Sequence, residues 1–294
     1  MLHKPKIIVV LGPTSTGKSD MAVMLAKRFN GEVVSADSRQ VYRGMDLGTG
    51  KITKKEMGGI PHYMLGVANP KSVFNVSKYK IQTQKIITDI LKRGKLPILC
   101  GGTGFYIDAV VDNIVLPDVL PNPELRKKLE EKTAEQLFAI LKKLDPARAK
   151  NIDAQNKVRL VRAIEIAKSL GKVPKIKTNQ IYDPVFIGLE CPDLALQERI
   201  SARLLRRLDE GMVAEVARLH KQGVSYRRLE KFGLEYRNCA QLLQGKITLP
   251  QLIQNLEREI FQYAKRQITW FKRNKKIMWF DSRKIKLKEL FSLL

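Results

Sequence analysis

The chain has 294 residues, of which 44% are hydrophobic, a composition typical of a globular protein with two domains or with one domain and an insertion. Its 54 Lys and Arg against 29 Asp and Glu leave a formal charge of +25, which favours a polyanionic partner. Three scattered cysteines exclude a disulfide framework and a zinc site, and no apolar run approaches the length of a membrane span. We expect a cytoplasmic monomer with no membrane partner.

Strand and helix patterns alternate over the first hundred residues, as they do in parallel α/β folds. The apolar runs predict strands at residues 7–11, 32–35 and 96–100, and the helical spacing predicts a helix over residues 76–92.

A phosphate-binding loop follows the first predicted strand. The segment Gly12-Pro13-Thr14-Ser15-Thr16-Gly17-Lys18-Ser19 is a full match to the pattern G-x-x-x-x-G-K-S/T, and an amphipathic stretch follows it. Its glycines let backbone N–H groups close around an anion, and the helix N-terminus adds a partial positive charge. Lys18 adds a full charge, and the Ser19 hydroxyl can ligate Mg²⁺. The loop therefore predicts binding of a di- or triphosphate without saying which one.

A second polar segment follows the second strand and reads Asp37-Ser38-Arg39-Gln40. Because neighbouring parallel strands end at the same edge of a sheet, Asp37 is expected near the phosphate loop. A carboxylate there can hold Mg²⁺, accept a proton from a nucleophile, or simply cap a turn. The later strand ends in Cys100-Gly101-Gly102 instead of a metal-holding Asp, which argues against a nucleotide hydrolase.

The middle of the chain changes character at a proline-rich segment, residues 116–123. Helical patterns follow, including a capping box at residues 133–136 and a helix over residues 156–170. A strand at residues 185–189 is expected to return to the sheet. Further helices are predicted at residues 194–210, 212–221, 235–244 and 249–273, followed by a short strand at residues 277–280.

The predicted fold is α/β, with a P-loop parallel sheet core, a helical insertion domain and a helical C-terminal part. We assign residues 1–116 and 184–294 to the catalytic core and residues 117–183 to the insertion. Residues 258–288 contain eleven Lys and Arg but only Glu259 and Asp281 against them, with aromatic residues interleaved. That stretch suits nucleic acid, although most of its aromatics are expected to face the core.

Four segments together resemble the bacterial tRNA dimethylallyltransferase family. They are the phosphate loop, residues 37–46, residues 101–104, and residues 264–271, which read Ala-Lys-Arg-Gln-Ile-Thr-Trp-Phe. The resemblance extends over nearly the whole chain, in order and at matching spacing. Ser19 stands where Thr is common in the family. The resemblance is to bacterial members, so we expect no zinc-finger tail like that of eukaryotic members.

The resemblance implies transfer of a dimethylallyl group from dimethylallyl diphosphate to the exocyclic N6 amine of the adenine just 3′ of the tRNA anticodon. It implies that the phosphate loop holds the isoprenoid diphosphate instead of ATP, with Mg²⁺ as cofactor on Ser19. Asp37 matches the general base, which accepts the proton as the C–N bond forms. The residues implied in diphosphate binding and catalysis are Asp37, Lys18, Thr14 and Arg203.

The resemblance also implies contacts with the tRNA anticodon stem-loop, which turns its target base out of the stack. The residues that match these contacts are Asp37, Ser38, Arg39, Gln40, Thr103, Arg126, Val158, Arg159, Leu160, Val161, Arg162, Gly233, Tyr236, Arg237, Lys265 and Arg266. By similarity, the helical insertion clamps the stem-loop.

Three alternatives remain. An adenylate isopentenyltransferase shares the core but modifies free AMP or ADP, and the basic C-terminal stretch and the insertion argue against it. A small-molecule P-loop kinase predicts ATP turnover and weak affinity for tRNA. A non-catalytic RNA-binding protein predicts no reaction that depends on Asp37.

Overall fold

The chain divides into two compact units. The computed structural model describes residues 4–285 and 290–291. Unit 1 comprises residues 1–113 and 180–294, and unit 2 comprises residues 114–179. The division falls three to four residues earlier than the boundaries of the predicted insertion. Unit 2 leaves unit 1 shortly after a short helix and returns shortly before a strand, so the sheet is continuous around it.

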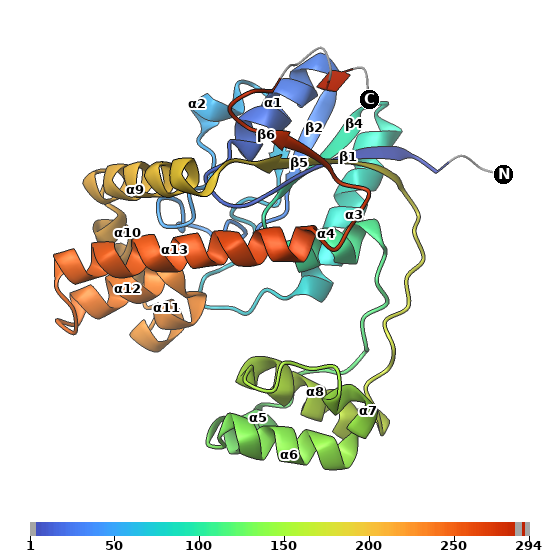
Figure 1. Ribbon diagram of the computed structural model, residues 1–294, viewed down its shortest axis with the longest axis vertical. Helices are drawn as coiled ribbons and strands as arrows, with labels where there is room; N and C mark the ends of the chain where they lie inside the picture. The colour runs from blue at the N-terminus through green and yellow to red at the C-terminus, as the bar shows by residue number, and fades with distance from the viewer. Residues whose placement is uncertain (1–3, 286–289, 292–294) are drawn as a thin grey trace. The chain divides into compact units, whose positions relative to one another are not determined.

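A six-stranded parallel sheet forms the centre of unit 1 (Figure 1), with the strand order β3-β2-β4-β1-β5-β6. The phosphate loop and the turn after β2 therefore leave the same edge of the sheet, on either side of β4. The strands are β1 (Lys6–Leu11), β2 (Gly31–Ser35), β3 (His62–Tyr63), β4 (Leu96–Gly101), β5 (Asp183–Glu190) and β6 (Met278–Asp281).

Helices cover both faces of this sheet. Side chains alternate between the two faces along each strand. On β1, Ile8 and Val10 pack with α1, whereas Ile7 and Val9 pack in the larger cluster with α3, α4 and the C-terminal helices. The described helices of unit 1 are α1 (Lys18–Arg28), α2 (Lys54–Met57), α3 (Val76–Lys92), α4 (Gly104–Val111), α9 (Asp193–Asp209), α10 (Met212–Lys221), α11 (Tyr226–Phe232), α12 (Leu234–Leu243) and α13 (Leu249–Phe271).

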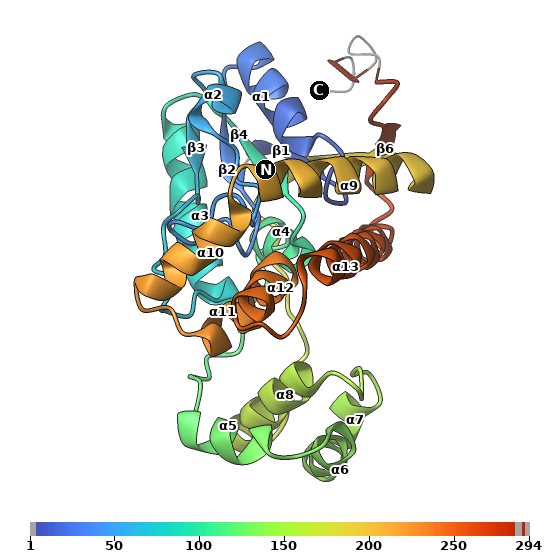
Figure 2. The same cartoon turned by 90° about the vertical axis from the view of Figure 1, so that its left-hand side faces the viewer.

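The long helix α13 supports the site. It begins with a capping box between Thr248 and Gln251, and Pro250 lies in its first turn, where the missing N–H costs nothing. Its buried stripe, which includes Leu252, Leu256 and Ile260, packs against α9 and α12. Figure 2 shows α13 running beside α9 and α12.

Unit 2 is a small helical bundle with its own core. Its helices are α5 (Pro123–Glu130), α6 (Ala134–Leu144), α7 (Pro146–Ala149) and α8 (Lys157–Leu170). Leu137, Leu141, Leu160 and Ile164 are fully buried in that core. The predicted capping box of Thr133 and Gln136 starts α6.

The predicted fold class is confirmed, as are the predicted strands and long helices. The edge strand β3 and the short helices α2, α4, α5, α7 and α11 were not predicted individually, because segments of two to eight residues have too little periodicity. β6 forms an edge of the sheet but begins at Met278, one residue later than predicted. Among the described residues, no helix is long and apolar enough to cross a membrane.

Candidate active site

The phosphate loop connects β1 to α1 in a conformation that only glycine allows at its first position. Gly12 has a φ of +142°, and a Cβ there would collide with the carbonyl of Leu189 in β5. The loop is closed by two hydrogen bonds to the Pro13 carbonyl, from Thr16 Oγ1 at 2.9 Å and from Lys18 Nζ at 2.6 Å. The helix α1 then starts at Lys18, so its free N–H groups face the loop.

Lys18 lies in surroundings that favour an anionic ligand. Burial lowers the pKa of Lys18 to about 8, and Arg203 acts in the same direction, whereas Cys100 and Asp37 raise it. A bound anion would reverse that shift because it stabilises the charged amine.

The helix α9 presents a row of arginines to the same space. Arg199, Arg203, Arg206 and Arg207 follow one another at helical spacing and all line the cavity. Arg203 donates to Thr14 Oγ1 and to the Gly50 carbonyl, both at 3.3 Å. Burial, together with Arg207 and Arg206, lowers the pKa of Arg203 to about 10. Positive charge is therefore concentrated opposite the phosphate loop, as binding of a polyphosphate requires.

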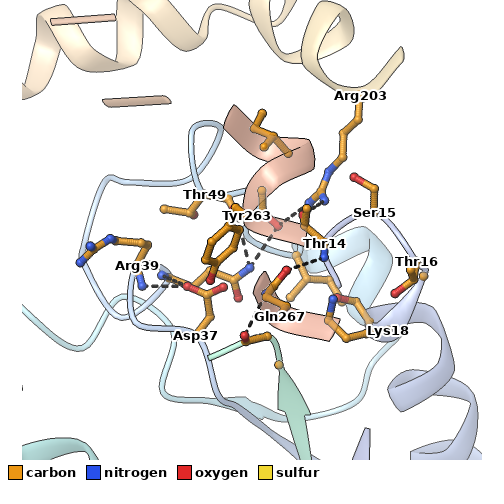
Figure 3. Close-up of a pocket in the computed structure, with 18 of the residues that line it drawn as sticks. Thr14, Ser15, Thr16, Lys18, Asp37, Arg39, Thr49, Arg203, Tyr263 and Gln267 are labelled. Atoms are coloured by element: carbon orange, nitrogen blue, oxygen red, sulfur yellow. Dashed lines mark hydrogen bonds between the residues drawn. The ribbon is translucent and has the colours of Figure 1, made fainter. Parts of the chain in front are cut away.

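Asp37 lies in a tight turn at the end of β2. Its Oδ1 accepts hydrogen bonds from the backbone N–H of Arg39 at 2.7 Å and of Gln40 at 3.2 Å. The turn interpretation of this residue is therefore correct, but the carboxylate also lines the cavity. Figure 3 shows Asp37 beside Tyr263 of α13, with Gln267 between Asp37 and the phosphate-loop residues Thr14 and Lys18. Burial raises the pKa of the Tyr263 phenol, and the nearby Asp37 charge raises it further.

One cavity of about 1030 Å³ joins these elements. Its walls come from the phosphate loop, the turn after β2, the loop at residues 48–52, β4, α9, the start of α12 and α13. Eight cationic side chains line it against four carboxylates, so its interior favours anions. The cations are Lys18, Arg39, Arg199, Arg203, Arg206, Arg207, Arg237 and Arg266.

A buried carboxylate on α10 holds the loop that precedes Gly50. Glu215 accepts the backbone N–H groups of Asp46 at 2.9 Å, Leu47 at 2.8 Å and Gly48 at 3.1 Å. Tyr236 donates its hydroxyl to the same carboxylate at 2.7 Å. Sequence reasoning missed Glu215, because a lone glutamate on an amphipathic helix looks solvated.

Several residues that were expected to contact tRNA do reach the cavity. Ser38, Arg39, Gln40, Gly233, Arg237 and Arg266 line it together with Asp37. Thr103 lies behind the turn, where its hydroxyl accepts the Ser38 N–H at 3.0 Å. Gln40 is held internally, because its amide donates to the Gly50 carbonyl at 3.2 Å and accepts from Ser35.

Two of these residues differ from the expectation. Tyr236 is only 2% exposed and its hydroxyl is used by Glu215, so its side chain supports the cavity wall. Lys265 points to Asp193, with Nζ 2.8 Å from the carboxylate, and does not line the cavity. Two lysines of the predicted basic stretch, at positions 286 and 288, lie outside the described residues.

The expected tRNA contacts in unit 2 fall into exposed and buried sets. Val158 and Arg159 are exposed at the start of α8. Arg126 and Arg162 pair with the buried Glu165 at 2.7 Å and 3.0 Å, and Val161 packs against the core. Leu160 is fully buried, which corrects its assignment as a contact residue: at helical spacing, a residue between two surface positions can face inward.

A sequence profile of the IPP transferases matches residues 40–274, which is most of the chain. The chain belongs to the IPP transferase family. A tRNA dimethylallyltransferase 2 from Treponema denticola is 44% identical over 279 residues, which are 93% of each protein. A tRNA dimethylallyltransferase from Anoxybacillus flavithermus is 38% identical over 94% of this chain and 90% of its own length.

A solved structure of this family has the same fold. The full-length tRNA isopentenylpyrophosphate transferase from Bacillus halodurans is 37% identical and has a TM-score of 0.75. The match covers 99% of this chain and 94% of that protein. The match therefore includes both the α/β core and the insertion of this chain.

Proposed function

We infer that this protein is a tRNA dimethylallyltransferase. It transfers a dimethylallyl group from dimethylallyl diphosphate to the exocyclic N6 amine of the adenine 3′-adjacent to the tRNA anticodon and releases diphosphate. Family membership supports this function, because the similar proteins are named tRNA dimethylallyltransferases and match this chain over almost their full length. The observation that carries it is the single cavity in which the phosphate loop and the arginines of α9 lie together with Asp37.

The diphosphate would lie between the phosphate loop and α9. Loop N–H groups, Lys18 and Arg203 surround that space, and Arg203 is already oriented by its hydrogen bond to Thr14 Oγ1. As the bond from the allylic carbon to oxygen breaks, negative charge collects on the leaving diphosphate. Fixed positive groups stabilise that charge with little reorganisation, which lowers the barrier.

The adenine amine would approach from the side of Asp37. As the new C–N bond forms, the nitrogen becomes acidic, and Asp37 accepts the proton it loses. Both recorded hydrogen bonds to this carboxylate end on Oδ1, which leaves Oδ2 as the oxygen that faces the amine. The turn therefore holds the base in place while the proton moves.

We propose Mg²⁺ as the cofactor, held by Ser19 together with oxygens of the diphosphate. Ser19 lies exposed at the first turn of α1 and lines the cavity. Mg²⁺ usually takes few protein ligands and completes its shell with water and substrate phosphates, which fits a lone hydroxyl. In the part of the chain that is described, no group of three His, Cys, Asp or Glu could form an all-protein cage. When bound, the ion would neutralise charge on the leaving diphosphate.

The tRNA anticodon stem-loop is the proposed macromolecular partner, and unit 2 is proposed to bind it. The chain's +25 charge suits a polyanion, and Arg159 and Val158 are exposed at the start of α8. A base turned out of the loop would enter the cavity past Arg39 and Arg266. We propose that the protein is a monomer that acts in the cytoplasm, where its proposed substrate tRNA is found.

One incubation tests this function. The protein is mixed with dimethylallyl diphosphate, Mg²⁺ and unmodified tRNA, and the tRNA nucleosides are analysed by mass. The expected product is an adenosine heavier by one dimethylallyl group. Parallel reactions contain AMP or ADP in place of tRNA, or ATP in place of the isoprenoid. Modification of AMP in preference to tRNA, or turnover of ATP alone, would replace the proposal with one of its alternatives.

A further inference from the structure

We propose that Gln267 is a positioning residue for this reaction. Its side chain ties the diphosphate loop to Gly102, and the next residue, Thr103, holds the turn that carries Asp37. Gln267 thereby sets the distance between the breaking C–O bond and the incoming amine. This inference rests on the function proposed above. Nothing in the motif at residues 264–271 showed from sequence which of its side chains faces inward.

The Gln267 side chain bridges two glycine-rich loops. It is 6% exposed, on the face of α13 that points to the sheet edge. Its Oε1 accepts the backbone N–H of Thr14 at 2.9 Å, and its Nε2 donates to the Gly102 carbonyl at 2.8 Å. Figure 3 shows the Gln267 side chain with the hydrogen bond that joins it to Thr14. Each partner is a buried or half-buried backbone group that would otherwise lack a partner there.

On the phosphate-loop side, this bond fixes Thr14. The Thr14 N–H points to Gln267 and not into the anion site, so the residue can turn its hydroxyl toward Arg203. Arg203 in turn donates to the Gly50 carbonyl. The orientation of the arginine that faces the diphosphate therefore depends on Gln267 through one intervening residue.

On the other side, the Gly102 bond leads to Asp37. Thr103, the next residue, donates its N–H to the Ala36 carbonyl at 3.1 Å and accepts the Ser38 N–H at 3.0 Å. These two bonds hold the residues on either side of Asp37. Gln267 is therefore the link between the backbone that holds the diphosphate and the backbone that holds the base.

The chemistry of this link requires a neutral amide. The side chain must offer one acceptor and one donor at once, and an ionised carboxylate lacks the donor. A carboxylic acid in its protonated form again offers both. The helix α13 has a separate anchor one turn later, where Trp270 Nε1 donates to Asp108 at 3.0 Å. Docking of the helix and bridging of the loops can therefore be separated by mutation.

Three variants test the proposal in steady-state transfer assays with tRNA. Gln267→Met keeps the volume but removes both hydrogen bonds, Gln267→Glu restores them only when protonated, and Trp270→Phe loosens α13 as a matched control. Binding of inorganic diphosphate and of tRNA is measured separately, and thermal unfolding is recorded for each variant.

We expect Gln267→Met to lower kcat by ~10²-fold with each KM within about threefold, because small misplacements of reacting groups cost rate more than affinity. Relative to the unaltered protein, Gln267→Glu is expected to gain activity as pH falls from 8 to 6, because only the protonated acid can both accept from Thr14 and donate to Gly102. Trp270→Phe is expected to lower kcat by less than about threefold, even if its melting temperature falls as much as that of Gln267→Met.

Three results would overturn the assignment: unchanged kcat in Gln267→Met, a rise in KM alone, or an equal loss of kcat in Trp270→Phe. A Gln267→Glu profile parallel to that of the unaltered protein would also contradict the role of the amide. If the unaltered protein itself fails to prenylate tRNA, the proposed function is wrong, and that outcome is distinct from loss or retention of activity in the variants.

Discussion

Lys18 and Arg203 in the cavity and Arg159 in unit 2 carry the same charge in opposite surroundings. Burial lowers the pKa of Lys18 to about 8 and that of Arg203 to about 10, whereas Arg159 is exposed. Cations that are largely removed from water are costly unless an anion joins them, so the cavity favours an anionic ligand. Exposed cations attract any polyanion and do so less at high salt. Substitutions in the cavity should therefore weaken diphosphate binding, and substitutions in unit 2 should weaken the salt-dependent binding of tRNA.

Removal of the proposed base should have the largest effect and should leave both binding regions intact. Asp37→Asn keeps the shape and the acceptor oxygen of the turn but cannot take a proton. We expect kcat to fall by ~10³-fold or more, with tRNA affinity within about threefold. Single-turnover transfer and a tRNA filter-binding assay measure the two quantities. Retained turnover with lost tRNA affinity would mean that Asp37 acts in recognition and not in catalysis.

Loss of the cavity lysine should follow in size. Lys18→Ala removes a buried charge that faces the leaving diphosphate, so we expect kcat/KM for dimethylallyl diphosphate to fall by ~10²- to 10³-fold. Affinity for inorganic diphosphate, measured by calorimetry, should fall as well, while the salt dependence of tRNA binding stays the same. Equal binding of diphosphate by both proteins would remove Lys18 from the anion site.

The lowered pKa of Lys18 predicts that diphosphate binding in the cavity depends on pH. Because the free protein holds this pKa near 8, the amine loses its proton as pH rises through 8, and diphosphate affinity should weaken from pH 7 to pH 9. Binding at pH 8.5 should also take up protons, since the bound anion raises the pKa. Calorimetry in two buffers of different ionisation enthalpy detects that uptake. Binding without proton exchange above pH 8 would contradict the lowered pKa.

The smallest expected effect lies in unit 2. Arg159→Ala should weaken tRNA binding several-fold and reduce the slope of log affinity against log salt by about one unit, without a change in diphosphate affinity. Lys168, exposed near the end of the same helix, provides the matched control Lys168→Ala. If both variants change the slope equally, α8 contributes general charge and no defined contact. If neither does, the proposed tRNA surface is misplaced.

The boundaries of the regular elements followed closely from local pattern. The capping boxes at Thr133 and Thr248 start α6 and α13, and Asn75 caps α3 where the periodicity begins. These signals lie within one turn of the residues they affect, so a single sequence contains them. The phosphate loop belongs to the same class, because its strand, glycines and helix are contiguous.

Side-chain roles that depend on residues distant in sequence could not be predicted in this way. Leu160 was expected to contact tRNA together with its neighbour Arg159, but its side chain is buried in the core of unit 2. Lys265 and Arg266 are adjacent in the chain, yet only Arg266 lines the cavity. Tyr236 was expected at the tRNA surface and instead donates to a buried Glu215. No local pattern distinguishes such residues, because their surroundings come from other helices.

The sequence by itself determined the α/β core, the anion-binding loop, the acidic turn after the second strand and the excess of positive charge. Each of these depends on residue type and short spacing, which set backbone conformation and charge without reference to the rest of the chain. Only the tertiary structure decided that Glu215 holds the loop before Gly50 and that Gln267 joins Thr14 to Gly102. Those bonds span more than 160 residues of sequence. The Gln267 bonds form because the parallel sheet brings its loops to one edge and α13 packs against them, and the Glu215 bonds form because α10 packs against the loop at residues 46–48.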